Sequence, residues 1–161
     1  MSTDPLLQLL RTKARYAHDE LAALLSLSAD QVRDRIAAWE KDGTILGYQA
    51  VVDPEKADAD AVAAFIEVKV TPERGGGFDR LALRIARFDQ VTSCYLASGG
   101  YDLMVVVEGG DLREVARFVS EKLSTLDGVL STATHFRLKT YKENGFIFER
   151  ETASERLAVS P

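Results

Sequence analysis

The stretch Asp19–Tyr48, DELAALLSLSADQVRDRIAAWEKDGTILGY, decides the fold of the first third of this 161-residue chain. Its apolar residues recur at helical spacing in two blocks, on either side of a Ser-Leu-Ser turn. Ser28 and Gln31 form the sequence signature of a capping box that starts the second block, and Gly43 is placed to end it in the left-handed conformation. The pattern predicts a helix-turn-helix. That geometry can lay its second helix in the major groove of DNA, but it also occurs in ordinary helical hairpins.

The same spacing predicts two helices before the turn and one after it. The first covers about Asp4–Lys13, and the second covers about His18–Leu25, where two carboxylates in the first turn suit the helix dipole. Past the third helix, the apolar pattern of TILGYQAVV predicts a short strand over Thr44–Val52. The inward residues of the third helix lie at i, i+4 and i+7: Val32, Ile36 and Trp39.

The side of the third helix opposite Val32 is the predicted DNA-contacting surface. It carries charges of both signs. An aspartate can accept a hydrogen bond from the cytosine amino group, so carboxylates here can specify sequence while lowering affinity. Alternatively, they are solvated charges on a helix whose DNA binding is weak or lost. The predicted DNA-binding residues are Ser28, Asp30, Gln31, Arg33, Asp34, Arg35 and Lys41.

The charge of the chain does not favour strong phosphate binding. The formal net charge is −5, and residues 1–53 contain six Lys and Arg residues against eight Asp and Glu residues. Strong phosphate binders usually carry a basic patch. We therefore expect any DNA affinity to come from the local placement of charges and from two copies acting together.

The composition is that of a globular protein, with 46% hydrophobic residues. No apolar run approaches the roughly 20 residues of a membrane helix, and the N-terminal residues show no signal-peptide cleavage pattern. We expect a cytoplasmic protein without a membrane partner. The single cysteine, Cys94, excludes an internal disulfide and a thiolate zinc site, and its apolar surroundings favour a core position. His18 and His135 have no partners at ligand spacing, so we expect neither a metal site nor a cofactor.

The second part of the chain has a different pattern. Residues 54–60 are polar and include a proline, which favours a linker between domains at 1–53 and 61–149, with a tail over 150–161. Strand and helix periods then follow in the order βαββαβ, the ferredoxin-like arrangement, in which both helices cover one face of a four-stranded antiparallel sheet. The predicted fold class is therefore α+β. The strands are predicted at Ala61–Val70, Val91–Ala97, Asp102–Glu108 and Val129–Leu138, the helices at about Phe78–Phe88 and Asp111–Leu123, and an extra edge strand or docking tail at Tyr141–Phe148.

The ferredoxin-like arrangement leaves one face of its sheet without helices. In the third strand, Leu103 and Val105 point to one side while Met104 and Val106 point to the other. The uncovered side would be an apolar patch in water, and a second copy packed sheet against sheet would cover it. We therefore expect an obligate homodimer, which would also present two helix-turn-helix units to two half-sites of double-stranded DNA.

Several stretches of the chain carry a resemblance to a known family. The matching residues are ELAALLSLS, then Val32, Arg35 and Ile36, then EKDGTILGYQAVVDPEK (Glu40–Lys56), SGGYDLMVVVEG (Ser98–Gly109) and LDGVLSTATHFRLKTYKENG (Leu126–Gly145). In this order, and over nearly the whole chain, they resemble the Lrp/AsnC (leucine-responsive, feast/famine) regulators. The resemblance implies a winged or simple helix-turn-helix domain and an effector-sensing βαββαβ domain. It also implies dimers that assemble further, and an amino acid or related small metabolite as effector.

By the same resemblance, effectors sit between neighbouring dimers, near the turn that joins the second and third strands of the module. Glycine-flanked amides there can hold a carboxylate, and the carboxylate of Asp102 can pair an α-ammonium group. Alternatively, the two glycines only make a tight hairpin, Asp102 is a turn residue, and the threonines make no contact. The predicted effector-binding residues are Gly99, Gly100, Tyr101, Asp102, Thr132 and Thr134.

Two other classes of function stay open at this point. The chain departs from the family pattern at Asp34-Arg35, where an arginine pair is common, and at Ala17-His18, where a hydroxyl or Asn cap is usual. Both departures weaken the expected DNA binding but not the predicted fold. The acidic recognition helix favours a sensor of the same fold that has weak or lost DNA binding and acts through a partner protein. The other class is an enzyme, because a few family-like proteins decarboxylate tetrapyrroles. The sequence shows no group of carboxylates or histidines that indicates catalysis, so we predict no catalytic residues.

Overall fold

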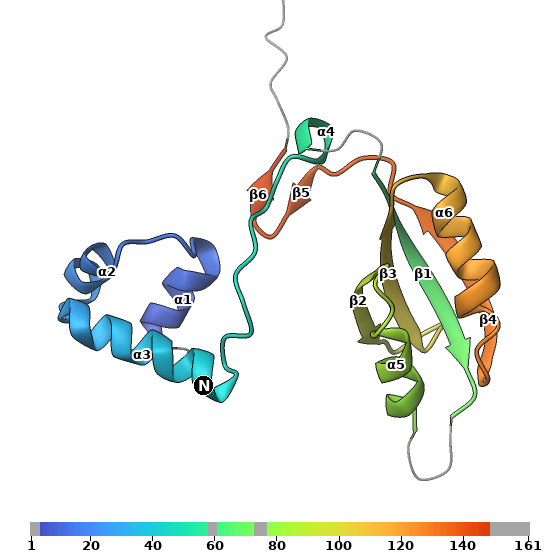
Figure 1. Cartoon of the computed structure of the whole chain (residues 1–161), viewed down its shortest axis with the longest axis horizontal. Helices are drawn as coiled ribbons and strands as arrows, with labels where there is room; N and C mark the ends of the chain where they lie inside the picture. The colour runs from blue at the N-terminus through green and yellow to red at the C-terminus, as the bar shows by residue number, and fades with distance from the viewer. Residues whose placement is uncertain (1–3, 58–60, 73–76, 149–161) are drawn as a thin grey trace, which may run out of the picture. The chain divides into compact units, whose positions relative to one another are not determined.

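The structure, a computed structural model, describes residues 4–57, 61–72 and 77–148. The described chain forms two compact units (Figure 1). The helical unit runs up to Val51 and also includes Lys142–Ile147, whereas the sheet unit holds Val52–Tyr141. No sequence pattern links residues 142–147 to the helices. The domain limits drawn at residues 54–60 stay a prediction, and the tail over 150–161 lies outside the described residues.

Three helices make up most of the helical unit: α1 (Pro5–Thr12), α2 (His18–Leu25) and α3 (Ala29–Asp42). α1 begins where it does because Asp4 Oδ1 accepts the amide of Leu6 at 2.9 Å, and because Pro5 stands at the first helical position, where no donor is lost. α2 ends at Ser26, which adopts a left-handed conformation with φ of 56°. The three predicted helices are confirmed: α2 has the predicted ends, and α1 is one residue shorter than predicted at each end.

The start and end of α3 follow the sequence signals. Ser28 Oγ accepts the amide of Gln31 at 3.1 Å, and Gln31 Oε1 accepts the amide of Ser28 at 2.8 Å, so the capping box is confirmed. Gly43 ends the helix with φ of +79°, a conformation that costs glycine little. The helices meet over a small core of buried residues: Leu6, Leu10, Leu21, Ala22, Val32 and Ile36.

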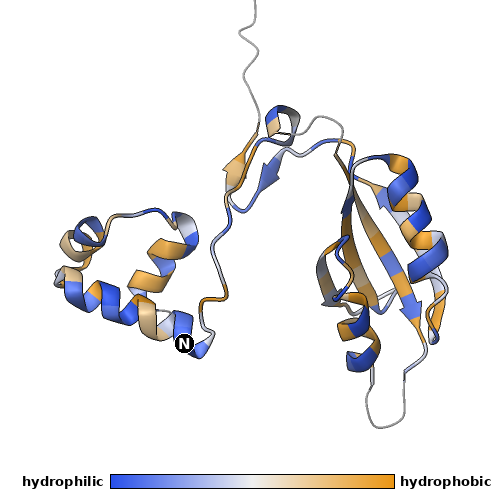
Figure 2. Cartoon of the chain, viewed as in Figure 1, coloured by the Kyte–Doolittle hydropathy of each residue, from blue (hydrophilic) through white to orange (hydrophobic). Residues whose placement is uncertain are grey.

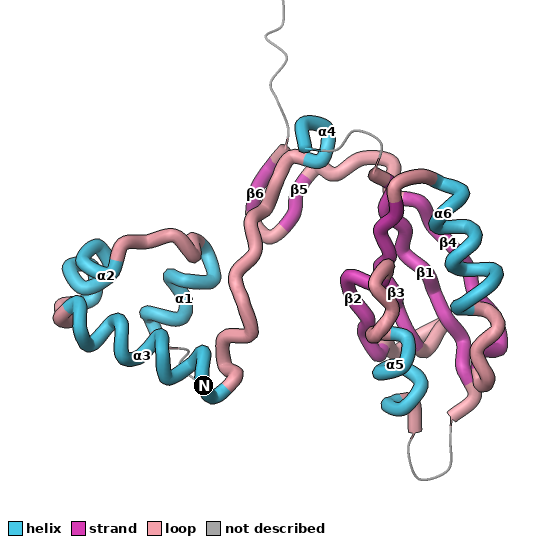
Figure 3. Tube along the Cα trace, viewed as in Figure 1, coloured by secondary structure: helices cyan, strands magenta, loops and turns pink. Residues whose placement is uncertain are grey.

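The segment that follows α3 is not a strand. Residues 44–53 make no strand pairing, Leu46 is 95% exposed, and Figure 3 draws the segment as loop. The strand predicted over Thr44–Val52 is therefore wrong. An apolar pattern favours a strand only where a neighbouring strand supplies hydrogen-bond partners, and no strand of the described chain does so for residues 44–53.

The extra edge strand predicted near residue 145 is also corrected. Among the residues that the structure describes, β5 (Lys142–Glu143) and β6 (Phe146–Ile147) pair only with each other, so this segment adds no strand to the larger sheet. Asn144 and Gly145 form the turn between them, with φ of 47° and 92°. Two successive positive φ angles suit the two-residue hairpin turn that Asn-Gly favours.

The sheet unit has the predicted ferredoxin-like topology. Its strands are β1 (Val62–Val70), β2 (Val91–Leu96), β3 (Leu103–Gly109) and β4 (Val129–Phe136), all antiparallel to their neighbours in the order β2-β3-β1-β4. The helices are α5 (Asp79–Ile85) and α6 (Leu112–Arg117), the latter continuing as the π-helix η1 (Phe118–Leu123). A single helical turn, α4 (Pro54–Ala57), occupies part of the predicted linker.

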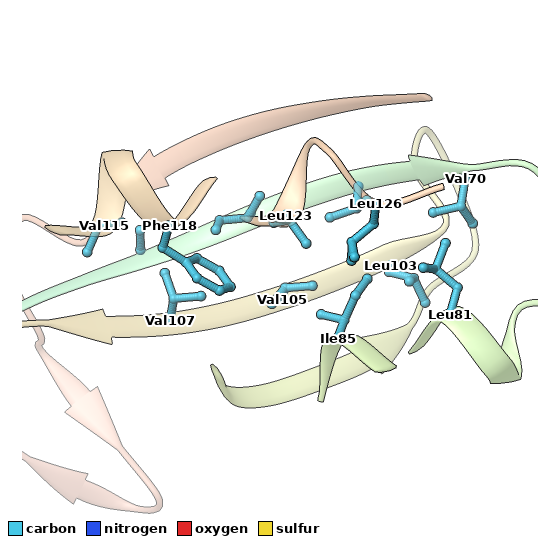
Figure 4. Close-up of a cluster of buried hydrophobic side chains, with 13 residues drawn as sticks. Val70, Leu81, Ile85, Leu103, Val105, Val107, Val115, Phe118, Leu123 and Leu126 are labelled. Carbon is cyan, nitrogen blue, oxygen red and sulfur yellow. The ribbon is translucent and has the colours of Figure 1, made fainter. Parts of the chain in front are cut away.

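The core of the sheet unit lies between the sheet and its helices. Figure 2 shows hydrophobic residues along the strands, and Figure 4 shows Phe118 and Leu123 of η1 meeting Val105 and Val107 of β3. Both helices therefore cover one face, as predicted. The buried residues are Ala64, Ile66, Val68, Val70, Leu81, Ile85, Leu103, Val105, Val107, Val115, Phe118, Leu123 and Leu126.

The opposite face of the sheet is uncovered by the described chain. Phe65 pairs with Val106 and with His135 across the strands, and Met104 pairs with Tyr95. Phe65 is 38% exposed and Tyr95 is 58% exposed. We call this surface the open face. It also carries one polar pair, since His135 Nε2 lies 3.3 Å from Glu67 Oε1.

Among the helices of the described residues, none combines the length and the apolar character needed to cross a membrane.

Candidate DNA-binding helix and effector turn

All seven predicted DNA-binding residues are exposed on the helical unit. Six of them form or flank the surface of α3 that points away from Val32 and Ile36, and the seventh, Ser28, caps the helix. Ser28 and Gln31 have a structural task, because they hold each other in the capping box. The sequence therefore predicted the exposed surface of α3, but not which of its side chains are engaged within the protein.

Both arginines of this surface are paired with carboxylates. Arg33 Nη2 donates to Asp30 Oδ1 one turn earlier. Arg35 Nη1 lies 3.3 Å from Oδ2 of Asp4, the same residue that caps α1, so this pair joins the start of α1 to α3. Within the part of the chain that the structure describes, no ion pair involves Lys41. Lys41 is thus the most available cation on the helix.

The chain that leaves α3 is tied back to the helix. Asp42 Oδ1 accepts the amide of Thr44 at 2.9 Å, and the hydrogen bonds from Thr44 lower the pKa of the Asp42 carboxyl. The hydroxyl of Tyr48 donates to Glu40 Oε1 at 2.9 Å. Desolvation, with help from this hydrogen bond and the charge of Glu40, raises the pKa of Tyr48. Sequence reasoning missed this anchor, because an i to i+8 contact across a helix end follows no periodic pattern.

The predicted effector turn joins β2 to β3. The amide of Ala97 donates to the carbonyl of Asp102 at 2.8 Å and closes the hairpin, and Gly99 has φ of 139°, which favours glycine. A Cβ added to Gly99 or Gly100 would meet no atom of the described chain within 4 Å. The two glycines are exposed, so their backbone is accessible to a ligand.

Asp102 has a role in the fold that the sequence did not show. Its Oδ2 accepts the amide of Val70 at 2.9 Å, and its own amide donates to the carbonyl of Val68 at 3.0 Å. The side chain therefore fixes the end of β1 against the start of β3. Asp102 is half-buried, so its carboxylate combines this contact with access to solvent.

The two predicted threonines lie on the helix-covered side of β4. Thr132 Oγ1 lies 3.2 Å from Ser124 Oγ, next to the end of η1. In the register of the sheet, Val68 has Leu103 on one side and Thr132 on the other. Thr132 is thus two strand spacings, about 10 Å, from the start of β3 beside Asp102. Thr134 lies further along the strand, opposite Ile66.

Comparison with known proteins identifies the family. The model of the Lrp/AsnC ligand binding domain matches residues 63–146, which include the sheet, both of its helices and the candidate effector turn. The chain belongs to the Lrp/AsnC family.

Relatives of the Lrp/AsnC chain match along nearly its whole length. It is 46% identical to the HTH-type transcriptional regulator YugG of Bacillus subtilis (strain 168), over 97% of this chain and 95% of that protein. It is 25% identical to the leucine-responsive regulatory protein of Haemophilus influenzae, over 86% and 82% of the two chains. These matches include the helix-turn-helix, so the chain is a DNA-binding transcriptional regulator.

Solved structures of similar chains support the same fold. The regulator NMB0573 of Neisseria meningitidis, solved as a complex with L-Met, superposes with a TM-score of 0.69 at 25% identity, covering 88% of this chain and 94% of that one. The AsnC protein of E. coli superposes with a TM-score of 0.66 at 25% identity, covering 89% and 97%.

In this Lrp/AsnC chain, Cys94 takes the core position expected of it. It is half-buried on the helix-covered side of β2, packed against the core. Burial raises the pKa of the Cys94 thiol, which lowers its reactivity at neutral pH.

Proposed function

We propose that this regulator binds double-stranded DNA through the exposed surface of α3, as a homodimer, and that an amino acid bound at the β2–β3 turn alters this binding. The observation that carries the proposal is the placement of Asp102. Its half-buried carboxylate lies within three residues of two exposed glycines, inside the region that matches a ligand binding domain.

The chemistry of the turn suits an α-amino acid. Backbone amides of Gly99 and Gly100 are accessible donors for a carboxylate, and Asp102 supplies a negative charge for an α-ammonium group. The NMB0573 regulator was solved with L-Met, so a similar chain takes a ligand of this class. Tyr101 is half-buried beside the glycines and can contact the side chain of the ligand.

For DNA binding, α3 is held in place by contacts that suit a recognition helix. The capping box fixes its start, Gly43 ends it, and the pair between Asp4 and Arg35 ties it to α1. Lys41 is placed to contact phosphate, while Asp34 can accept from a cytosine amino group. For Arg33 to contact DNA, it must exchange Asp30 for a phosphate or a base edge. DNA binding also implies that the protein works in the cytoplasm.

The open face supports the proposed homodimer. Phe65, Met104 and Val106 would lose their contact with water if a second copy packed sheet against sheet, and apolar burial stabilises such an interface at about 25 cal/mol per Å². Further assembly of dimers, with the effector between them, extends the same proposal. Light scattering at micromolar concentration tests it: a dimer or a larger assembly is expected, and a monomer contradicts it.

A mobility-shift assay at two salt concentrations tests the whole proposal. The probe is DNA from upstream of the gene for this chain, with each of the standard amino acids added in turn. We expect specific retardation of the probe that weakens steeply as the salt concentration rises. We also expect that adding one or a few of the amino acids changes this retardation. A thermal-shift screen of the same amino acids identifies the effector separately, because a ligand of the folded state raises the melting temperature.

One observation favours a second candidate function. Arg33 and Arg35 are both neutralised by carboxylates, and Asp34 is exposed on the same helix. A helix with this charge suits a sensor that acts through a partner protein. Absence of retardation at low salt, together with a clear thermal shift by an amino acid, would favour that function.

A further inference from the structure

The cations of the helical unit are poorly placed to neutralise a DNA backbone. Duplex DNA carries about one negative charge per 1.7 Å of its axis. Residues 1–53 hold more carboxylates than cations, and half of the six cations stand in ion pairs. A DNA-binding protein with this charge needs phosphate contacts elsewhere. The three pairs are Lys13 with Glu20, Arg33 with Asp30, and Arg35 with Asp4.

A line of arginines lies on the sheet unit. Arg80, Arg84 and Arg87 follow each other at i, i+4 and i+7 along α5 and the turn after it, which places them on one side of the helix. All three are exposed, while Leu81 and Ile85 of the same helix are buried against the sheet. We call the three residues the α5 arginine stripe. Together they line one shallow hollow of the surface, with Leu81, Leu83 and Asp127.

The stripe differs from other basic residues of the sheet unit in its surroundings. Within the described ranges, no ion pair involves Arg84 or Arg87. Arg113 and Arg117 of α6 form no ion pair within the described ranges either, but carboxylates flank Arg117 along the helix, with Glu114 three residues before it and Glu121 four residues after it. The α5 stripe is therefore a local concentration of positive charge in a chain whose net charge is −5.

We propose that the α5 arginine stripe binds the phosphate backbone of duplex DNA, as a second contact besides α3. A guanidinium group matches phosphate geometry with two parallel hydrogen bonds. From Arg80 to Arg87 the stripe extends about 10 Å, which covers about three phosphates of one strand. The proposal rests on the proposed binding of DNA by α3, and it adds cations that the helical unit lacks.

The test measures the salt dependence of DNA binding by the full chain. The probe is a random-sequence duplex of roughly 40 base pairs, about four helical turns, long enough to extend past the helical unit. Arg84→Gln/Arg87→Gln removes two exposed charges from the stripe. Because each phosphate contact contributes about 0.9 to the slope of log K against log salt, we expect the slope to fall by about 1.8.

The matched control is Arg113→Gln/Arg117→Gln, which removes the same charge from the other helix on the same side of the sheet. Its slope is expected to stay at the value of the unaltered chain. Equal losses in both variants would show an effect of net charge alone and would overturn the proposal. So would an unchanged slope in the α5 variant.

Two further outcomes separate this proposal from the function on which it rests. If the unaltered chain binds no DNA at low salt, the proposed function fails and the stripe fails with it. If the unaltered chain binds but Arg84→Gln/Arg87→Gln instead lowers the oligomeric mass in light scattering, the stripe joins copies of the protein. The DNA contact of the stripe is then wrong, while DNA binding by α3 stands.

Discussion

The helical unit and the sheet unit bury very different numbers of apolar side chains. Among the described residues, six buried side chains hold the three helices together, whereas thirteen form the core of the sheet unit. At about 0.05–0.15 kcal/mol per residue, a unit of roughly 50 residues has about 2.5–8 kcal/mol of stability, and one of roughly 90 residues has about 4.5–14 kcal/mol. The part of the molecule proposed to contact DNA therefore tolerates less damage than the part expected to sense the effector.

The same substitution in both cores gives the largest expected effect. Leu21 and Leu103 are both fully buried, and replacing either by alanine costs about 2–5 kcal/mol. We expect Leu21→Ala to unfold the helical unit and abolish DNA binding while the sheet unit stays folded. Leu103→Ala should weaken the sheet unit but leave it folded.

The chain contains a native reporter in each unit, which makes this comparison direct. Trp39, its single tryptophan, packs against the helical core, and Cys94, its single cysteine, packs against the sheet core. Trp39 fluorescence should report unfolding in Leu21→Ala while Cys94 stays protected from alkylation. If Leu21→Ala exposes Cys94 to alkylation as fast as it shifts the Trp39 fluorescence, the two units unfold together. That result would contradict the difference in stability expected between them.

Asp102 gives the next largest effect, on the sheet unit. Asp102→Ala leaves the amide of the buried Val70 without its acceptor, which costs about 1–3 kcal/mol. Asp102→Asn keeps an oxygen for that amide but removes the charge that would pair an ammonium group. We expect the Asn variant to keep most of its thermal stability and to lose amino acid binding in calorimetry. Tight binding by the Asn variant would remove Asp102 from the effector site.

The comparison of the units also shows which features can be predicted from sequence. The helix caps and the βαββαβ order were predictable from sequence, because each cap and each strand or helix period is a pattern of residues close together in the chain. The prediction of a strand at Thr44–Val52 was wrong because a strand needs a neighbouring strand as hydrogen-bond partner. An apolar pattern within one segment does not show whether such a partner is present. The single turn α4 and the π-helical turns of η1 were missed, because apolar spacing fits an uninterrupted α-helix equally well over Asp111–Leu123.

For the candidate site, the sequence located residues but not their contacts. The exposure of α3 and of the Gly99-Gly100 turn follows from helix and hairpin periodicity. The pairing of Arg35 with Asp4, and of Asp102 with Val70, joins residues more than 30 positions apart. Such contacts depend on how the elements pack. These two contacts therefore became visible only in three dimensions.

The capping box gives a smaller effect, confined to the helical unit. Ser28→Ala removes the acceptor for the amide of Gln31, and the loss of such a cap costs about 1 kcal/mol, within a range of about 0.5–2 kcal/mol. Urea unfolding followed by Trp39 fluorescence should show the loss. Alkylation of Cys94 should not change. Thr125→Ala, an exposed hydroxyl in the sheet unit, is the control and should leave the Trp39 transition where it is.

The smallest effect needs no substitution, only a change of pH. Burial raises the pKa of Cys94 above its ordinary value of 9.0, so the folded chain disfavours the thiolate. The stability that this contributes is present below pH 9.0 and is lost as pH rises through the pKa of the folded state. Alkylation of Cys94 should therefore be slower than that of a free thiol at the same pH, and the two rates should converge as the solution becomes more alkaline. Because Cys94 lies on β2, an edge strand of the sheet, equal rates at neutral pH would instead mean that this edge opens readily, and that the sheet unit is less stable than its core suggests.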